Sequence, residues 1–574
     1  MAVAGYGILS LLVTWPLARD FRTYVLGEVH YDIWHAIWVL WYDLEALLGR
    51  ASWPWTSMLH CPHGISVLCD GVGPVNALLA LPFWPWGPVA AFNGAVLLGM
   101  VGSAWSQFLL ARHAGLDPAP AFFSGALFVA WPVHLAALGG HLEKVFVGLL
   151  PLSLYAGLLA FDPRRRTAWS MAPAVVLLLT LLQNGHQLVF AAIALVILGI
   201  ECIATARPAS RSATLLRVLV SGGLAIAAIA PLVFLVIATT RGLRIDLGRF
   251  SSYYAPDVAQ LVVPAPHQRI ASWLYRDTPT ADFGRPSSAP FLSPSRGWYG
   301  SGNETAVAIP FTAIALMVVA WRAREARRWI VAGAVLAVLS LGPALRTGLL
   351  PPISLRVPLP YAALLRVPGI GFIRTPGRFM LMAAVPLALA AGFGLATAMR
   401  RFPRGGHLVA IGVLAITLAE CWPLPWPQTA PPPLPDFYRE LGADPGDGAV
   451  LDLPEGFTFN EPAAAYQYYQ VLHQRPIAWS YLSRSYPTFP IDGLEALFSS
   501  RATDPAAARE RLRKLGYRYV VWHKHPELFG RHRVAESPVL LGAPVAPWSS
   551  AFIRGAFRGE RPVHDDDLVT VYAI

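Results

Sequence analysis

The sequence predicts a polytopic α-helical membrane protein of about eleven transmembrane helices, followed by a small extracytoplasmic α/β domain at the C-terminal end. The first observation is composition: the chain is 55% hydrophobic and only 14% charged, with a mean hydropathy of +0.47, far more apolar than an ordinary soluble protein. The second is that hydrophobic segments of membrane-spanning length recur along most of its 574 residues. The third is the placement of arginine, which alternates from loop to loop.

The predicted spans are apolar segments whose ends are set only to within a few residues. In chain order they are 3–17, 89–110, 119–138, 145–161, 168–182, 188–206, 215–237, 306–321, 329–345, 379–399 and 408–421. The first segment has neither a positively charged n-region nor a cleavage site, so we expect it to remain as a helix. Together these spans form a transmembrane domain over 1–424.

Arginine marks alternate loops. The clusters on one side of this topology are Arg112, Arg164 to Arg166, Arg207, Arg211, Arg217, Arg322, Arg324, Arg327, Arg328, Arg400, Arg401 and Arg404. By the positive-inside rule that side is cytoplasmic, which places the N-terminus inside and everything after the last span outside the plasma (inner) membrane. The formal net charge of +11 is therefore largely topological, and it gives little reason to expect a nucleic-acid partner.

The first outside loop, 19–88, carries an acidic and aromatic stretch directly after the first span. Apolar and aromatic residues after Asp32 recur at spacings of three and four, which predicts an amphipathic helix. Its three tryptophans favour a helix that lies in the membrane interface. Cys61 and Cys69 fall in the same loop and could close a small disulfide, since no metal-binding spacing competes for them.

A second long outside loop, 241–303, is rich in proline and serine. After the last span, 425–435 is proline-rich and predicts a semi-rigid linker. The remainder, 436–574, is soluble in character and long enough to bury its own core. Within it, 449–453 and 517–522 are candidate strands and 504–515 is a candidate helix, so we expect an α/β domain.

Ionisable residues gather at the outside ends of neighbouring spans. They are Glu28, His30 and Asp32 in the first loop, His141, Glu143 and Lys144 before the fourth span, His186 before the sixth, and Arg374 and Arg378 before the tenth. Ionisable groups near hydrocarbon are costly, so their convergence on one side predicts a functional site. A transporter or lipid flippase would instead place them near the bilayer midplane. A non-catalytic scaffold gives no reason for a one-sided cluster.

The chain resembles the glycosyltransferase superfamily C (GT-C). The resemblance lies in one span, a large outside loop with an acidic residue ahead of an aromatic helix, many further spans and an outside domain. Four short sequence segments add to the resemblance: Thr14-Trp-Pro-Leu17, His60-Cys-Pro-His-Gly64, Val450-Leu-Asp-Leu-Pro454 and Tyr481-Leu-Ser-Arg484. It implies that Asp32 matches the acidic residue commonly assigned as the base and that the sugar donor is a polyprenyl-phosphate sugar. The loop has no Asp-Asp or Glu-Asp pair and the chain has no Trp-Trp-Asp motif, so Asp32 is assigned by position.

The chemistry of such a transfer suits these residue types. A carboxylate can deprotonate an acceptor hydroxyl, and cations can hold the phosphate that leaves. We therefore expect Asp32, with Glu28 as second choice, to be the general base, and direct displacement to invert the anomeric carbon. Substrate contacts would come from His30, His141, Glu143, Lys144, His186, Arg374 and Arg378. The acceptor is a glycan, lipid or protein that the sequence does not identify.

Each of these assignments has a structural alternative. Asp32 could cap the helix that follows it. The 141–144 segment could be a solvated loop in which Glu143 pairs with Lys144, and His186 could be a turn residue that begins the sixth span. Arg374 and Arg378 could be interface anchors. We expect the reaction to require no cofactor; a divalent metal is an open alternative that the sequence does not support.

Overall fold

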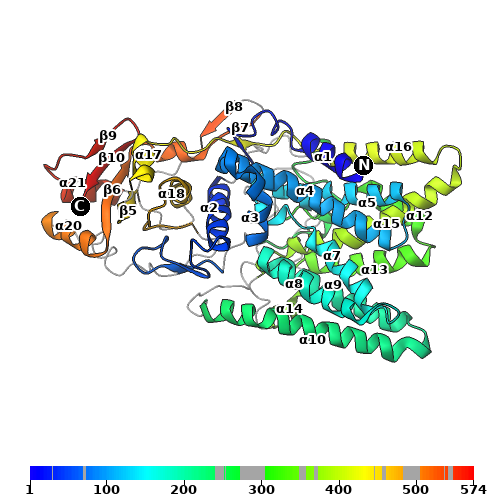
Figure 1. The fold of residues 1–574 in the computed structure, drawn as a ribbon. Coiled ribbons are helices and arrows are strands. Elements are labelled where there is room, and N and C mark those ends of the chain that lie inside the picture. The colour runs from blue at the N-terminus through cyan, green and yellow to red at the C-terminus, as the bar shows by residue number, and fades with distance from the viewer. Residues whose placement is uncertain are drawn as a thin grey trace.

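In the computed structural model, a helical bundle and a C-terminal region of strands and helices lie at opposite ends of an elongated molecule, with helix α2 (His30–Leu47) between them (Figure 1). The residues that the structure describes are 1–28, 30–68, 73–239, 251, 254–271, 304–347, 357–367, 373–444, 446–454, 461–481, 505–534, 537–540 and 547–574. Cys69 and most of the 241–303 loop therefore lie outside the described residues, as does the predicted disulfide.

Each of the predicted spans corresponds to a helix or a helix pair. These are α1 (Ala2–Val13), α4 (Pro88–His113), α5 (Pro118–Val129) with α6 (Pro132–Leu135), α7 (Leu149–Phe161), α8 (Ala172–Gln183), α9 (Gly185–Thr205), α10 (Pro208–Thr239), α12 (Phe311–Ala320), α13 (Arg324–Ser340), α15 (Phe379–Arg401) and α16 (Gly406–Cys421). Several open with proline in the first turn, where its missing N–H leaves no hydrogen bond unmade.

Fewer of the described helices qualify as membrane crossings by length and composition than the eleven that the sequence predicts. Among the described helices five are long and apolar enough to cross, or six if the segments 118–129 and 132–139, bent by 49° to each other, count as one span. Helices such as α1, with 12 residues, extend only about 18 Å at 1.5 Å per residue, against about 30 Å of hydrocarbon. A count of eleven spans is thus not confirmed.

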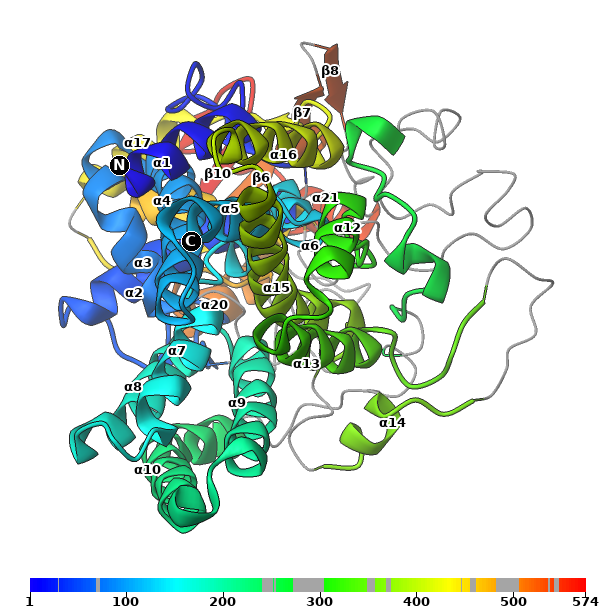
Figure 2. The ribbon, with the colours of Figure 1, turned by 90° about the vertical axis from the view of Figure 1, so that its right-hand side faces the viewer.

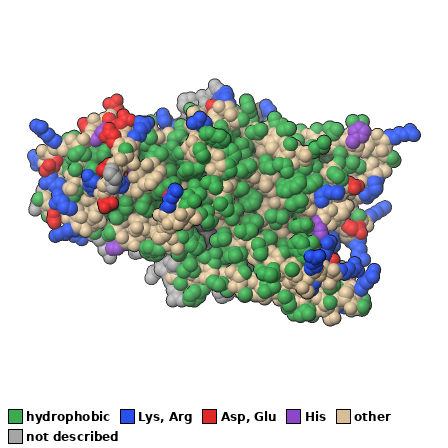
Figure 3. Space-filling model, viewed as in Figure 1, with side chains coloured by type: hydrophobic (Ala, Val, Ile, Leu, Met, Phe, Trp, Pro, Cys, Tyr) green, Lys and Arg blue, Asp and Glu red, His purple; other side chains and the backbone are tan. Residues whose placement is uncertain are grey.

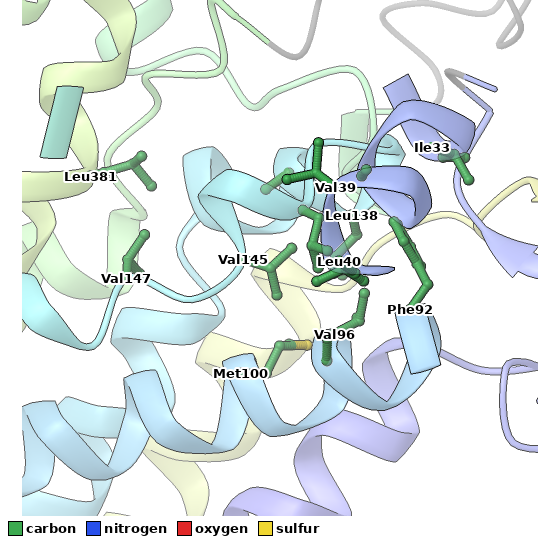
Figure 4. Packing of buried hydrophobic residues seen from close by; sticks show 14 of the residues in the cluster. Ile33, Val39, Leu40, Phe92, Val96, Met100, Leu138, Val145, Val147 and Leu381 are labelled. Carbon is green, nitrogen blue, oxygen red and sulfur yellow. The ribbon is translucent and has the colours of Figure 1, made fainter. Parts of the chain in front are cut away.

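The bundle is organised around α15, which packs against α5, α12 and α13. Small residues allow this close approach: a Cβ atom on Gly394 of α15 would lie 2.2 Å from the Leu316 carbonyl oxygen of α12. Viewed from the bundle end, α7 to α10 form one group and α1 and α16 lie on the opposite side of α15 (Figure 2). Figure 4 shows the apolar core where α2 meets the bundle, with Leu40 near Val96 and Met100 of α4 and Leu138 and Val145.

The surface separates into apolar and charged zones. Hydrophobic side chains cover most of the helical part, while charged side chains gather over the C-terminal domain and over the opposite end of the bundle (Figure 3). At that opposite end the arginine-bearing loops come together: Arg217 Nη1 donates to Ser170 Oγ at 2.9 Å, and Arg328 Nη1 lies 3.6 Å from Glu201 Oε1. These contacts bring Arg217 next to the segment that follows Arg164 to Arg166, and Arg328 next to the end of α9.

The aromatic helix α2 is not an interfacial helix, contrary to the expectation from its tryptophans. Trp34 and Trp38 are fully buried and Trp41 is 6% exposed. Their indole rings lie between the bundle and the C-terminal helix α18 (Glu461–His473), where Trp38 Nε1 donates to Gln470 Oε1 at 2.6 Å. An aromatic helix that packs beneath a domain has the same periodicity as one that packs against lipid head groups, so the sequence pattern could not separate the two.

The C-terminal region contains the predicted strands and helix. Its sheet has the order β5-β6-β10-β9, with β5 (Ala449–Leu453) parallel to β6 (Tyr517–His523) and the others antiparallel. The remaining elements are α17 (Asp436–Ala443), α20 (Pro505–Lys514), α21 (Pro547–Ala556), β9 (His564–Asp565) and β10 (Val569–Ala573). The division of the chain into domains remains a prediction.

The proline-rich linker is built into the fold. Strand β4 (Gln428–Thr429) pairs with β1 (Val25–Leu26) of the first loop and with β7 (Arg531–Val534), and β8 (Ser537–Leu540) completes this second sheet. Within the first loop, β2 (Trp55–Thr56) and β3 (Ile65–Ser66) pair, and α3 (Pro74–Ala80) precedes α4. The sheet ties the loop that carries Asp32 to the C-terminal region.

Candidate functional site

Asp32 lies in the first turn of α2 at the end of the bundle that faces the C-terminal domain. It is not the helix cap, because α2 begins two residues earlier, at His30. Its carboxylate is instead held by two side chains: Oδ1 accepts a hydrogen bond from the Tyr481 hydroxyl at 2.7 Å, and Oδ2 lies 3.2 Å from His141 Nδ1. With 21% of its side chain exposed, Asp32 keeps access to an incoming group.

A close approach of two backbones fixes the loop before α2. Glu28 N–H donates to the Gly139 carbonyl at 3.0 Å. Gly27 has a φ of +113°, and a Cβ there would lie 2.8 Å from the Gly139 backbone, so both the conformation and the space require glycine. This contact brings the loop of Asp32 next to the 139–144 segment. The Glu28 side chain is buried, and the side chain of His30 lies outside what the structure describes.

The center of the cluster is Glu304, which sequence analysis did not select. Its carboxylate accepts hydrogen bonds from Lys144 Nζ at 3.1 Å and from Arg378 Nε at 2.9 Å, and a second Arg378 nitrogen binds its other oxygen. The exposed fractions of these side chains are small: 7% for Glu304, 6% for Lys144 and 11% for Arg378. This is a buried, bidentate ion-pair network and not a solvated loop.

His141 joins Asp32 to this network. Its Nδ1 lies 3.7 Å from Glu143 Oε1 as well as near Asp32, and its Nε2 lies 4.0 Å from Glu304 Oε1. Burial and the Lys144 ammonium lower the pKa of His141 more than the three carboxylates raise it. A neutral imidazole with its proton on Nδ1 would donate to Asp32 and orient it.

The electrostatics of Glu304 are dominated by its two cations. Burial opposes ionisation of the carboxyl, but Arg378 and Lys144 outweigh that and hold the pKa of Glu304 well below its usual range. Burial and the neighbouring Asp32 raise the pKa of Tyr481 well above its usual value, so its hydroxyl remains a hydrogen-bond donor at neutral pH. The cluster therefore combines fixed charges with a neutral donor.

The remaining predicted residues occupy the rim of the same cluster. His186 lies in the first turn of α9, which Asn184 caps, and its Nδ1 is 3.1 Å from Arg378 Nη1. Glu143 Oε1 is 3.8 Å from Arg378 Nη2. Arg374 is half-buried near Tyr481, and its guanidinium makes no hydrogen bond or ion pair within the described part of the chain.

The structure therefore brings together Asp32, His141, Glu143, Lys144, His186 and Arg378 from four separate loops, as the topology predicted. Their chemical roles remain predictions. Sequence analysis did not select Glu304 or Tyr481. The signal for Glu304 was an acidic residue just before a predicted span, at the outside end of that span. For a metal, the described residues contain no group of three or more His, Cys, Asp or Glu side chains arranged to bind one.

No protein-family model matches the sequence, and neither does any curated protein. Solved structures do match. The arabinofuranosyltransferase AftD from Mycobacteria has 16% sequence identity and a TM-score of 0.51 over 100% of this chain, which spans 39% of AftD. The oligosaccharyltransferase of Archaeoglobus fulgidus has 13% identity and a TM-score of 0.46, covering 92% of this chain and 69% of its own. ArnT from Cupriavidus metallidurans, bound to undecaprenyl phosphate, has 10% identity and a TM-score of 0.46, covering 100% and 97%.

The likeness to AftD, whose TM-score is above 0.5, confirms the resemblance found in the sequence at the level of the fold. At such identities the likeness concerns architecture alone, since unrelated functions share folds.

Proposed function

We propose that this chain is an integral membrane glycosyltransferase that moves a sugar from a polyprenyl-phosphate donor to an acceptor on the extracytoplasmic side. One observation carries the proposal: an accessible carboxylate, Asp32, sits in a hydrogen-bonded cluster with buried cations at one end of a GT-C-like bundle. That end lies opposite the arginine-bearing loops, so in this topology it faces away from the cytoplasm.

In the proposed reaction Asp32 is the general base. It removes the proton of an acceptor hydroxyl while that oxygen attacks the anomeric carbon, and the bond from this carbon to the phosphate oxygen breaks with its electron pair going to the phosphate. A single displacement of this kind inverts the anomeric configuration. Tyr481 and His141 hold the two oxygens of Asp32, which fixes the carboxylate for the attack. Glu28 is the second candidate for the base.

The leaving phosphate needs a cation, and the contacts favour Arg374 for this role. Lys144 and Arg378 are both bound to Glu304, so a phosphate would have to compete with a buried carboxylate for them. Arg374 has no such partner among the described residues and lies close enough to Tyr481 to affect it electrostatically. Lys144 and Arg378 would then stabilise the leaving phosphate through their electrostatic field. The substrate pocket would be completed by His30, His141, Glu143 and His186. The 241–303 loop and the C-terminal region would shape acceptor access.

The test is transfer by the purified full chain, supplied with a panel of radiolabelled polyprenyl-phosphate sugars and membrane lipid or glycan acceptors. Asp32→Asn should lower the rate by about 10²- to 10⁴-fold, the usual contribution of a general base. Asp436→Asn is the matched control, because that aspartate is 72% exposed on α17 and, among the described residues, forms an ion pair with Arg439 alone. Unchanged transfer in Asp32→Asn would remove the proposed base.

A second variant separates binding from chemistry. Arg374→Gln should raise the KM for the lipid donor by about 10- to 100-fold, the worth of one charge-assisted hydrogen bond, with a smaller effect on kcat. Retention of the anomeric configuration in the product, read by NMR, would exclude the single displacement. If the folded protein transfers sugar from none of the donors, the proposal that this chain is a glycosyltransferase is refuted.

A further inference from the structure

A groove of about 410 Å³ opens at the side of the bundle, away from the Asp32 cluster, where α1 ends and where the chain leaves α16. These two helices lie next to each other in both ribbon views (Figures 1 and 2). The lining includes Val13, Trp15, Arg19, Arg269, Trp426 and Gln428. All of them belong to the described part of the chain.

The walls of the groove are held without a ligand. Trp426 Nε1 donates to the Val13 carbonyl at 3.0 Å, which joins the segment after α16 to the end of α1. The Trp426 ring also stacks on His267, with ring centroids 5.7 Å apart. Arg269 N–H donates to the Trp422 carbonyl at 2.8 Å, so Arg269 is fastened to the same wall.

The charge of the groove is positive. Arg19 and Arg269 are exposed, and no acidic side chain is among the described residues that line the groove. Asp20 offsets part of this charge, since its Oδ2 lies 3.2 Å from Arg19 Nε. Arg269 has no such carboxylate within the described residues. Burial lowers the pKa of His267 to about 3, so the wall behind Trp426 adds no further charge at neutral pH.

The apolar surroundings match an amphiphile. Trp15 is 59% exposed beside the two arginines, and tryptophan concentrates where membrane meets water. Below it α1 exposes Ile8 and Leu11, and α16 exposes Ile411 and Ile416, each by 43% or more. A ligand would therefore meet cations at one end and the apolar surfaces of two helices at the other.

We propose that this groove binds an anionic membrane phospholipid, with its phosphate between Arg19 and Arg269 and its acyl chains along α1 and α16. The site is separate from the transferase site and goes beyond the proposed function, because none of its residues is assigned a part in the transfer. It has a link to that site, however. Gln428 lines the groove and pairs in β4 with Leu26 of β1, six residues before Asp32. A lipid bound here would stabilise the strand pair that anchors the Asp32 loop.

The test uses the delipidated full chain in a neutral detergent, titrated with phosphatidylglycerol or with zwitterionic phosphatidylcholine. Native mass spectrometry counts the bound lipid and thermal unfolding measures its effect on Tm. We expect phosphatidylglycerol to bind at least tenfold more tightly than phosphatidylcholine and to raise Tm. The double variant Arg19→Gln/Arg269→Gln should lose about 30-fold of that affinity, as expected for two basic side chains at an anionic lipid surface.

Arg400→Gln/Arg401→Gln is the matched control, since it removes two basic residues from the opposite end of the bundle and should leave the preference unchanged. Equal affinity for the two phospholipids, or an unaltered affinity in the groove variant, would overturn the proposal. So would binding of inorganic phosphate alone as tightly as phosphatidylglycerol, or a groove-dependent preference for undecaprenyl phosphate over phosphatidylglycerol. Because Arg19 and Arg269 are exposed, their double variant without lipid should unfold at the Tm of the lipid-free wild type. This measurement separates a loss of lipid binding from a loss of folding.

Discussion

Replacing Glu304 by glutamine should destabilise the protein strongly, although the two side chains have nearly the same shape. The carboxylate is the shared partner of Lys144 and Arg378, whose side chains are only 6% and 11% exposed. Removing one member of a buried ion-pair network leaves its partners charged and uncompensated, at a cost of about 3–5 kcal/mol. Because Glu143 lies 3.8 Å from Arg378 and compensates part of that charge, we expect a loss near the lower end, about 3 kcal/mol.

The assay is reversible denaturation of the purified protein in mixed micelles, with Glu201→Gln as the control. Glu201 pairs with Arg328 at 3.6 Å but both side chains are partly exposed, so its loss should cost less than about 1 kcal/mol. Adding Lys144→Met to Glu304→Gln should recover part of the stability, since one orphaned cation is removed. Equal losses for Glu304→Gln and Glu201→Gln, or strictly additive effects in the double variant, would refute the buried-network reasoning.

Three further predictions follow from individual contacts. The pKa of Glu304 is depressed in the folded state, so the stabilisation by its carboxylate is fully present above the unfolded value of about 4.3 and is lost as pH falls toward the folded value. When unfolding is measured at decreasing pH, the difference in free energy of unfolding between wild type and Glu304→Gln should therefore narrow only below about pH 4.3. Trp38→Phe leaves the buried Gln470 Oε1 without its 2.6 Å donor and should cost about 1–3 kcal/mol, with faster proteolysis of the C-terminal region; no change in either would contradict the packing of α2 on α18. Gly27→Ala should cost about 1–3 kcal/mol because of its φ of +113° and the Gly139 backbone, whereas Gly222→Ala, with open space around it, should be neutral or mildly stabilising in the same melts.

The sequence predicted those parts of the site that depend on topology. Arginine sidedness predicted which loops share one end of the bundle, and loops at one end of a helical bundle lie close together. His141 and Asp32 therefore met as expected, although nothing in their local sequences relates them. The helical segments were also predictable, because a long apolar run has few alternatives to a helix in a membrane.

What the sequence could not predict is contact between distant segments. Tyr481 lies 449 residues from Asp32, and Lys144 lies 160 residues from Glu304. No periodicity spans such separations. The environment of α2 was predicted wrongly because amphipathicity reports that one face is apolar, and not whether lipid or protein covers it. Hydrogen-bonding partners for buried indole groups, such as Gln470, are visible only once the C-terminal region is in place.

The same long-range contacts bear on why Asp32 is an unusual aspartate. It lies in the first turn of α2, where the helix dipole alone would stabilise its charge. Yet both of its oxygens are engaged by side chains from other parts of the chain, Tyr481 from the C-terminal region and His141 from the bundle. A carboxylate needed only for the helix has no reason to be held from two sides and still remain 21% exposed. Fixed orientation together with access is what a base requires, so the C-terminal region belongs to the proposed site and does not merely cover it.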